Sequence, residues 1–170
     1  MTRVDLIAGD HDLTPEQRTV ADRIAETRGE ISRPFQLLLH SPALAERVAD
    51  LGHLVRSGSS LSDADRELVT LATGRAIGCP FVWKSHLDAA TAAGITPATI
   101  AAMERDPAGL DERERALVSF VDELCTNRTV TDATFDAVRR LLGVRAVVEL
   151  ALTVGYYEML GSVMGACDAC

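Results

Sequence analysis

Three residues that can do chemistry lie within one largely apolar stretch of the chain. Glu67, Cys79 and His86 carry a carboxylate, a thiol and an imidazole. A carboxylate beside a histidine makes a general acid/base pair, and a thiolate is a nucleophile. We therefore take the three as candidate catalytic residues for proton transfer or for thiol chemistry.

Helix geometry decides which of the three can meet. Cys79 follows Gly78 at the start of a predicted helix, where free N–H groups and the helix dipole lower the pKa of a thiol. His86 lies two turns further on, on the same face but about 10 Å along the axis, so we expect no direct contact with Cys79. If the helices on either side of Gly78 form an antiparallel hairpin, Glu67 returns over this face and can pair with His86.

Each of these residues also has a purely structural interpretation. An isolated cysteine in an apolar segment is commonly packing, a single histidine is commonly a hydrogen-bonded core residue, and a helix glutamate is commonly solvated. Four further residues are candidates for binding a substrate: Val82, Trp83, His53 and Tyr156.

The chain ends in a Cys-x-x-Cys sequence, Cys167 to Cys170. This is the spacing of redox dithiols. No second Cys/His pair accompanies it to complete a zinc site, so we expect no metal. A terminal position, where fraying is common, favours a structural interpretation over a functional one.

Capping residues and turn residues predict an all-α fold of about seven or eight helices. Proline and Ser/Thr/Asp mark helix starts, glycine marks helix ends, and no period-2 alternation competes. Leu44, Val48, Leu51 and Val55 predict one continuous apolar helix face, and residues 57–60 predict a loop. We expect a single domain over residues 1–170, onto which the helix at 14–28 packs. The other predicted helices begin at residue 42 and span residues 62–76, 80–93, 97–105, 111–127, 131–142 and 144–165.

Composition narrows the class of protein. The 170 residues are 47% hydrophobic but only 4% aromatic, which favours helices over a β-sandwich. A net charge of −8 without any Lys/Arg run argues against nucleic acid as a partner. No stretch approaches the roughly 18 apolar residues of a membrane span, and the N-terminus has no signal-peptide pattern. We therefore expect a cytoplasmic protein with no membrane partner, whose cysteines are reduced unless used catalytically.

The chain resembles the carboxymuconolactone decarboxylase family, whose other branch is alkyl hydroperoxidase D. The resemblance covers about residues 35–165, and four segments carry it: Leu-Leu-His40 to Arg47, Asp65-Arg-Glu67-Leu-Val, Gly78-Cys79-Pro-Phe-Val-Trp83-Lys-Ser-His86, and Gly155-Tyr-Tyr-Glu-Met-Leu160. It implies an alkyl hydroperoxidase D-like helical fold that assembles into a trimer or hexamer.

The resemblance also implies roles for the candidate residues. Glu67, Cys79 and His86 match the hydroperoxidase motif Glu, then Cys-x-x-Cys-x-x-x-His, but Val82 stands where that motif has its second cysteine. Position 82 is the one expected to contact His86. Without a thiol there, a peroxidase based on Cys79 needs Cys167 or Cys170 to resolve its intermediate. The decarboxylase branch uses acid/base residues without metal or organic cofactor, and Glu67 and His86 suit that chemistry.

Three functions follow as hypotheses. The first is a cofactor-independent acid/base enzyme of the lyase type, acting on a small organic acid, lactone or carbonyl compound. In it, His86 is the general acid/base, Glu67 its partner, and Cys79 a thiol that lines the site. The second is a thiol-dependent peroxidase or redox protein that uses Cys79. The third is a non-catalytic oligomer that binds a small molecule.

Overall fold

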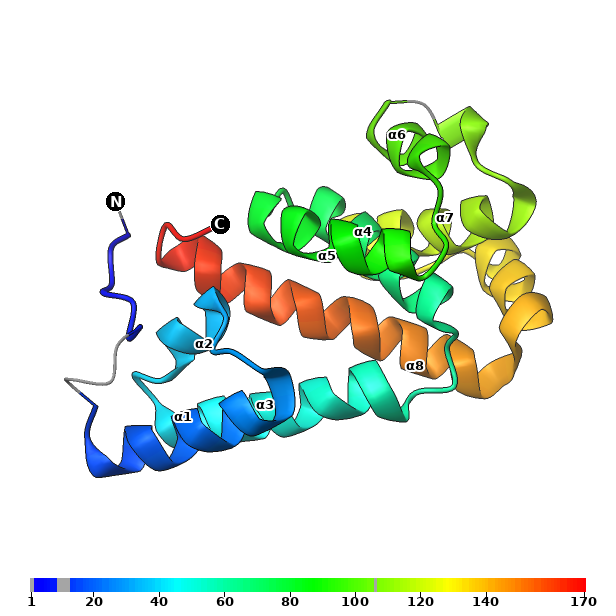
Figure 1. Ribbon diagram of the computed structural model, residues 1–170. Helices are drawn as coiled ribbons and strands as arrows, with labels where there is room; N and C mark the ends of the chain where they lie inside the picture. The colour runs from blue at the N-terminus through cyan, green and yellow to red at the C-terminus, as the bar shows by residue number, and fades with distance from the viewer. Residues whose placement is uncertain (1, 9–12, 106) are drawn as a thin grey trace. The chain divides into compact units, whose positions relative to one another are not determined.

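The computed structural model describes residues 2–8, 13–105 and 107–170. Every regular element in these residues is helical, so the predicted all-α fold class is confirmed (Figure 1). The helices are α1 (Pro15–Arg28), α2 (Arg33–Leu38), α3 (Pro42–His53), α4 (Asp63–Ala76), α5 (Pro80–Ala92), α6 (Pro97–Arg105), α7 (Glu112–Asn127) and α8 (Asp132–Ala166), with a π-helical turn at Leu54–Gly58 and a 3₁₀ turn at Pro107–Gly109.

Several of these helices begin at side-chain caps, at the positions that the sequence predicts. Thr14 and Gln17 form a reciprocal capping box at the start of α1, and Asp111 and Glu114 do the same at the start of α7. Ser62 accepts a hydrogen bond from the Asp65 N–H at the start of α4. These bonds satisfy N–H groups that have no partner within the helix, which is why the helix starts can be read from the sequence.

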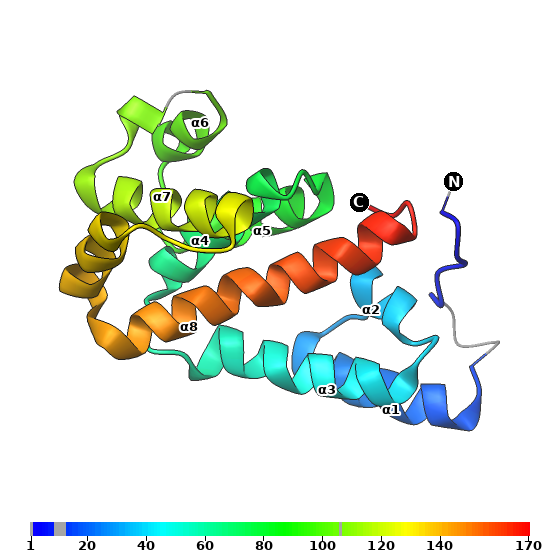
Figure 2. The same cartoon turned by 180° about the vertical axis from the view of Figure 1, so that it is seen from behind.

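Contacts divide the described chain into two compact units. The first holds the residues up to Gly58 and Ser162–Ala169, and its core joins α1 to α3 and includes Ile24 and Phe35. The second holds Ser59–Gly161 and Cys170, and in it α4 packs on both α5 and α7 (Figure 2). The single-domain organisation over residues 1–170 stays a prediction.

The core of the second unit is the larger of the two apolar clusters. Its largest fully buried side chains include Leu71 of α4, Leu117 of α7 and Leu150 of α8. Helix α4, which carries Glu67, packs on α5 and α7. Removing apolar surface from water stabilises the fold by about 25 cal/mol per Å². Burial of these side chains therefore holds α4, and with it the candidate carboxylate, in position.

Three details differ from the sequence prediction. Helix α2 was not predicted, and residues 54–58 form a π-helical turn where a loop was expected over 57–60. The predicted apolar face of α3 is wrong at Leu44, whose exposed fraction is 60%. Ala45, Ala49 and Gly52 are buried instead, because small side chains let α3 lie close to its neighbours.

The final long helix contains the predicted break. Gly143 has φ 80° and ψ 167°, which no helix residue adopts, so the predicted helices over residues 131–142 and 144–165 meet there within α8. Glycine reaches this conformation without a Cβ clash. Among the described residues, none of the helices combines the length and hydropathy that crossing a membrane requires.

Candidate active site

The α4–α5 hairpin is the frame of the candidate site. Gly78 adopts φ +64° between the helices, and the Cys79 N–H donates to the Gly74 carbonyl at 3.0 Å. Gly74 is required for close approach, because a Cβ there would lie 2.9 Å from the Trp83 backbone nitrogen and 3.0 Å from Val82 Cγ1. The antiparallel hairpin expected about Gly78 is therefore present.

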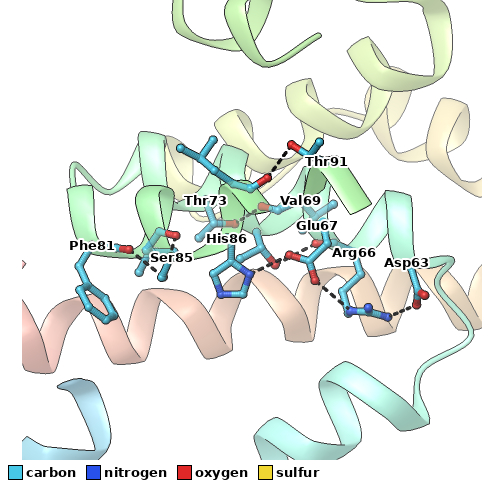
Figure 3. A network of polar contacts seen from close by, with 12 residues as sticks. Asp63, Arg66, Glu67, Val69, Thr73, Phe81, Ser85, His86 and Thr91 are labelled. Carbon is cyan, nitrogen blue, oxygen red and sulfur yellow. Dashed lines mark hydrogen bonds and ion pairs between the residues drawn. The ribbon is translucent and has the colours of Figure 1, made fainter. Parts of the chain in front are cut away.

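The hairpin brings Glu67 and His86 into direct contact. His86 Nδ1 lies 2.7 Å from Glu67 Oε2, and the two side chains point toward each other from α5 and α4 (Figure 3). A carboxylate accepts hydrogen bonds, so we assign the donated proton to Nδ1. That tautomer leaves Nε2 as the nitrogen that can take up a proton. The pair has the chemistry of a general base oriented by a carboxylate.

Burial and two neighbours hold this pair in place. The side chains of Glu67 and His86 are 8% and 19% exposed. Arg66 Nε lies 3.6 Å from Glu67 Oε1, too long for a hydrogen bond but close enough for ionic attraction, and Arg66 also binds Asp63 at 2.9 Å (Figure 3). The Tyr157 ring meets the His86 ring edge-on at a centroid distance of 5.0 Å. These contacts restrict the imidazole to one orientation.

The thiol of Cys79 is joined to the end of the chain. Cys79 and Cys170 form a disulfide across a sequence separation of 91 residues, with their Cα atoms 5.1 Å apart. Cys79 is the N-cap residue of α5 and is 2% exposed. Gly161 makes room beside it, because a side chain there would collide with Ile77 and its Cβ would lie 3.9 Å from the Cys79 Cβ.

The end of α8 turns the chain back through a Schellman cap. The Asp168 N–H donates to the Gly165 carbonyl at 3.2 Å, and the Ala169 N–H donates to the Met164 carbonyl at 2.8 Å. Asp168 adopts the left-handed conformation that this cap needs, with φ 58°. Cys170 follows directly, and its Sγ lies 3.7 Å from the Gly161 carbonyl oxygen. A backbone motif thus defines the direction of the terminal cysteine.

The other two cysteines are free thiols with different surroundings. Burial, followed by the negative charge of Glu158, raises the pKa of Cys125 to about 12. Such a thiol carries almost no thiolate at neutral pH and is inert. Cys167 is half-buried and follows the last helical residue of α8.

The predicted substrate-binding residues lie in different surroundings. Val82 is buried against Gly74, so its expected contact with His86 stays a prediction, and Trp83 packs against the core of the second unit. Tyr156 is buried with its ring edge-on to Tyr157 at 5.3 Å. The residue of this pair that touches His86 is Tyr157, which the sequence prediction did not select, because adjacent helix residues point in directions that only the packing distinguishes.

His53 lies in a separate pocket within the first unit. The pocket has a volume of about 380 Å³, and its lining includes Val20, Ile24 and Ala49 with a rim of Arg23 and Asp50. None of Glu67, Cys79 and His86 lines it. His40, a weaker candidate, donates from Nε2 to the Asp5 carbonyl at 2.8 Å, which is a structural role. Over residues 2–8, 13–105 and 107–170 there is no group of three or more His, Cys, Asp and Glu side chains arranged to hold a metal ion.

Comparison with known families finds one whose model matches the segment that carries the candidate site. The model of the carboxymuconolactone decarboxylase family matches residues 42–123, which include Glu67, Cys79 and His86. This match supports the resemblance to the carboxymuconolactone decarboxylase and alkyl hydroperoxidase D-like proteins over the part of the chain that carries the site. A comparison with curated protein sequences finds no match.

Solved structures share the fold at low sequence identity. The alkylhydroperoxidase AhpD core protein of Ralstonia eutropha JMP134 is 16% identical with a TM-score of 0.80, over 99% of this chain and 91% of that one. The debrominase Bmp8 is 17% identical with a TM-score of 0.77, over 99% and 90%. A Bmp8 variant with a cysteine changed to alanine, in complex with 2,3,4-tribromopyrrole, is 16% identical with a TM-score of 0.78, over 100% and 93%.

Proposed function

We propose that the protein is a thiol-dependent reductase of small electrophiles, with hydroperoxides as the substrate class, in which Cys79 attacks and Cys170 resolves. The observation that carries the proposal is the Cys79–Cys170 disulfide. The sequence lacks the second cysteine of the hydroperoxidase motif at Val82, and the disulfide supplies a resolving thiol from the chain end instead. This ranks the thiol chemistry above the acid/base lyase that the sequence alone favoured.

The proposed reaction has two balanced steps. The Cys79 thiolate attacks one oxygen of ROOH, the O–O bond breaks, and the products are a Cys79 sulfenic acid and, after protonation, ROH. The Cys170 thiol then attacks the sulfenic sulfur, which forms the disulfide and releases water. The peroxide is reduced by two electrons and the two thiols are oxidised by two. An external thiol reductant restores both thiols.

Local structure supports these roles. Cys79 is the N-cap residue of α5, so the positive end of the helix dipole stabilises its thiolate. His86, held by Glu67, is the general base of the same unit. Because Cys79 and His86 are separated by about 10 Å along α5, a proton passes between them through the substrate or solvent rather than by direct hydrogen bond.

Structural neighbours give further support from their names alone. They include a peroxidase-related protein from Silicibacter sp. TM1040 and the AhpD core protein of Ralstonia eutropha JMP134. The Bmp8 cysteine variant in complex with a tribromopyrrole extends the test panel to halogenated aromatic compounds.

The test is peroxide consumption by the reduced protein, followed by mass spectrometry. We expect wild type to consume one equivalent of organic hydroperoxide and to gain the Cys79–Cys170 disulfide. Cys170→Ser should stop at a Cys79 sulfenic acid that a dimedone probe traps, and Cys79→Ser should not react. Cys125→Ser, which removes an inert thiol, is the matched control and should behave as wild type.

An acid/base lyase remains the second candidate, and the Glu67–His86 hydrogen bond favours it. In that reaction His86 transfers a proton next to a carbonyl of a small acid or lactone. Cys79→Ser distinguishes the two functions, because the lyase does not need the thiol. Full turnover of a lactone or acid by Cys79→Ser, with no peroxide consumption by wild type, would overturn the thiol-dependent function.

A further inference from the structure

A pocket of about 380 Å³ lies within the first unit, and the candidate catalytic residues do not line it. Small-molecule sites have volumes from about 300 to 1,000 Å³. An apolar cavity of about 150 Å³ already binds benzene. The pocket therefore has room for a substituted single-ring molecule.

Two packed helices build this pocket from matched faces. Helices α1 and α3 lie side by side within the first unit (Figure 1). Each contributes four lining residues at the i, i+3, i+4, i+7 spacing of a single helix face, which are residues 20, 23, 24 and 27 of α1 and residues 46, 49, 50 and 53 of α3. Leu54, in the π-helical turn that follows α3, completes the lining. The pocket is thus formed by the packing of two regular helices rather than by a loop.

The buried part of the lining is apolar. Val20, Ile24 and Ala49 are buried there, and Leu54 adds a large apolar side chain that is 61% exposed. Covering apolar surface is favourable by about 25 cal/mol per Å². The lining therefore favours a ligand with an apolar body.

The charged groups around the pocket are paired with one another. Arg23 donates to Glu46 and, at 3.2 Å, to Asp50, and so bridges α1 and α3. Arg47 lies 3.9 Å from Glu46 and 3.6 Å from Asp50. Two guanidinium groups thus balance two carboxylates, and a charged ligand would have to compete with these pairs. A neutral ligand leaves them intact.

His53 supplies an unused polar group to the lining. Over the described part of the chain its imidazole makes no hydrogen bond, whereas the Thr27 hydroxyl already donates to the Ile24 carbonyl at 3.1 Å. A neutral imidazole offers one N–H donor and one nitrogen acceptor. A hydroxyl group is also both a donor and an acceptor, so it can pair with either ring nitrogen.

We propose that this pocket binds a small neutral molecule in which an apolar ring carries one hydroxyl group, and that His53 recognises the hydroxyl. The sequence predicts His53 as a residue that binds the substrate, and the proposal assigns it to a second site instead. This binding function goes beyond the reduction proposed for Cys79 and does not depend on it.

Titration of the intact chain with phenol tests the site, with methyl ¹H–¹³C spectra as the readout. We expect the methyl resonances of Ile24 and Leu54 to shift as phenol binds. Toluene, which has the same ring without the hydroxyl, should bind about twofold to tenfold more weakly, the usual worth of one hydrogen bond. Benzoate, which has the same ring with a charge, should also bind more weakly than phenol.

Three variants separate the hydroxyl contact from the apolar contact. His53→Ala should weaken phenol binding by about twofold to tenfold and leave toluene binding unchanged. Leu54→Ala should weaken the binding of both compounds. Leu44→Ala is the matched control, because Leu44 is 60% exposed on α3 but does not line the pocket. Its binding of both compounds should equal that of wild type.

Several results would overturn the proposal. They are an unchanged Ile24 resonance in phenol, equal affinity for phenol and toluene, and equal effects of Leu54→Ala and Leu44→Ala. His53 and Leu54 are exposed, so we expect both variants to fold, and circular dichroism checks this. No thiol reacts in these titrations, so they give the same answer whether or not the protein reduces hydroperoxides.

Discussion

Asp65 and Glu67 are two buried carboxylates on the same helix with partners of different chemistry. Asp65 is held by Arg113, whose Nε and Nη2 donate to its two oxygens at 2.9 and 2.7 Å. Glu67 is held by His86 through one bond of 2.7 Å. A guanidinium stays charged at all accessible pH values, whereas an imidazole gains and loses a proton in the physiological range.

This difference separates a structural charge from one that can take part in catalysis. Residues two positions apart in a helix are about 200° apart around its axis, so Asp65 faces α7 while Glu67 faces α5. The bidentate Asp65–Arg113 pair links α4 to α7 and cannot transfer a proton. The Glu67–His86 pair links α4 to α5 and can. Burial alone does not identify a catalytic carboxylate, but its partner does.

Changing each carboxylate to its amide tests this comparison, and the larger expected effect is that of Glu67→Gln. Glu67→Gln keeps the size and one acceptor oxygen but removes the charge that stabilises an imidazolium. We expect turnover to fall by about 10²- to 10⁴-fold, the usual contribution of general acid/base catalysis. Steady-state kinetics with the substrate identified by the peroxide or lyase assay measures this loss. Wild-type turnover in Glu67→Gln would remove the distinction between the two carboxylates.

Asp65→Asn is the matched control, and we expect its effect on stability instead. The amide loses the charge that balances Arg113, so the free energy of unfolding should fall by about 1–3 kcal/mol. The value is modest because the Arg113 side chain is 43% exposed and water screens its charge. Turnover per folded molecule should stay within about twofold of wild type. Urea unfolding monitored by circular dichroism measures the stability.

The sequence predicted the local part of this site and missed the distant part. Gly78 between two capped helices predicted the hairpin, and the hairpin brings Glu67 to His86. The Cys79–Cys170 disulfide joins residues 91 positions apart. Its formation depends on how the end of α8 packs in three dimensions, so the sequence left Cys167 and Cys170 as equal alternatives.

Helix boundaries were predictable because they depend on neighbouring residues in the sequence. Which face of a helix is buried was harder to predict. Capping side chains and glycine act within a few residues, which placed the ends of α1, α4, α5 and α7 correctly. The buried face of α3 was misjudged, because packing selected the small residue Ala45 over the larger and more apolar Leu44. Packing also decides that the tyrosine ring next to His86 belongs to Tyr157 rather than to Tyr156, whose role in binding stays a prediction.

The smallest expected effect is on the pH dependence of the free energy of unfolding, and it tests the role of the Asp65 charge. Burial alone would raise the pKa of Asp65, but the hydrogen bonds from Arg113 and Ser62 outweigh burial and lower the pKa below the ordinary value of 3.8. A carboxyl group whose pKa is lower in the folded state stabilises the fold above its unfolded pKa, and this contribution is lost as the pH falls through the folded value. The stability difference between wild type and Asp65→Asn should therefore be constant above about pH 5 and shrink as the pH falls below about 4. Urea unfolding of both proteins across this range measures the difference. A difference that stays constant down to about pH 2 would mean that the Asp65 charge does not link α4 to α7 as the geometry indicates.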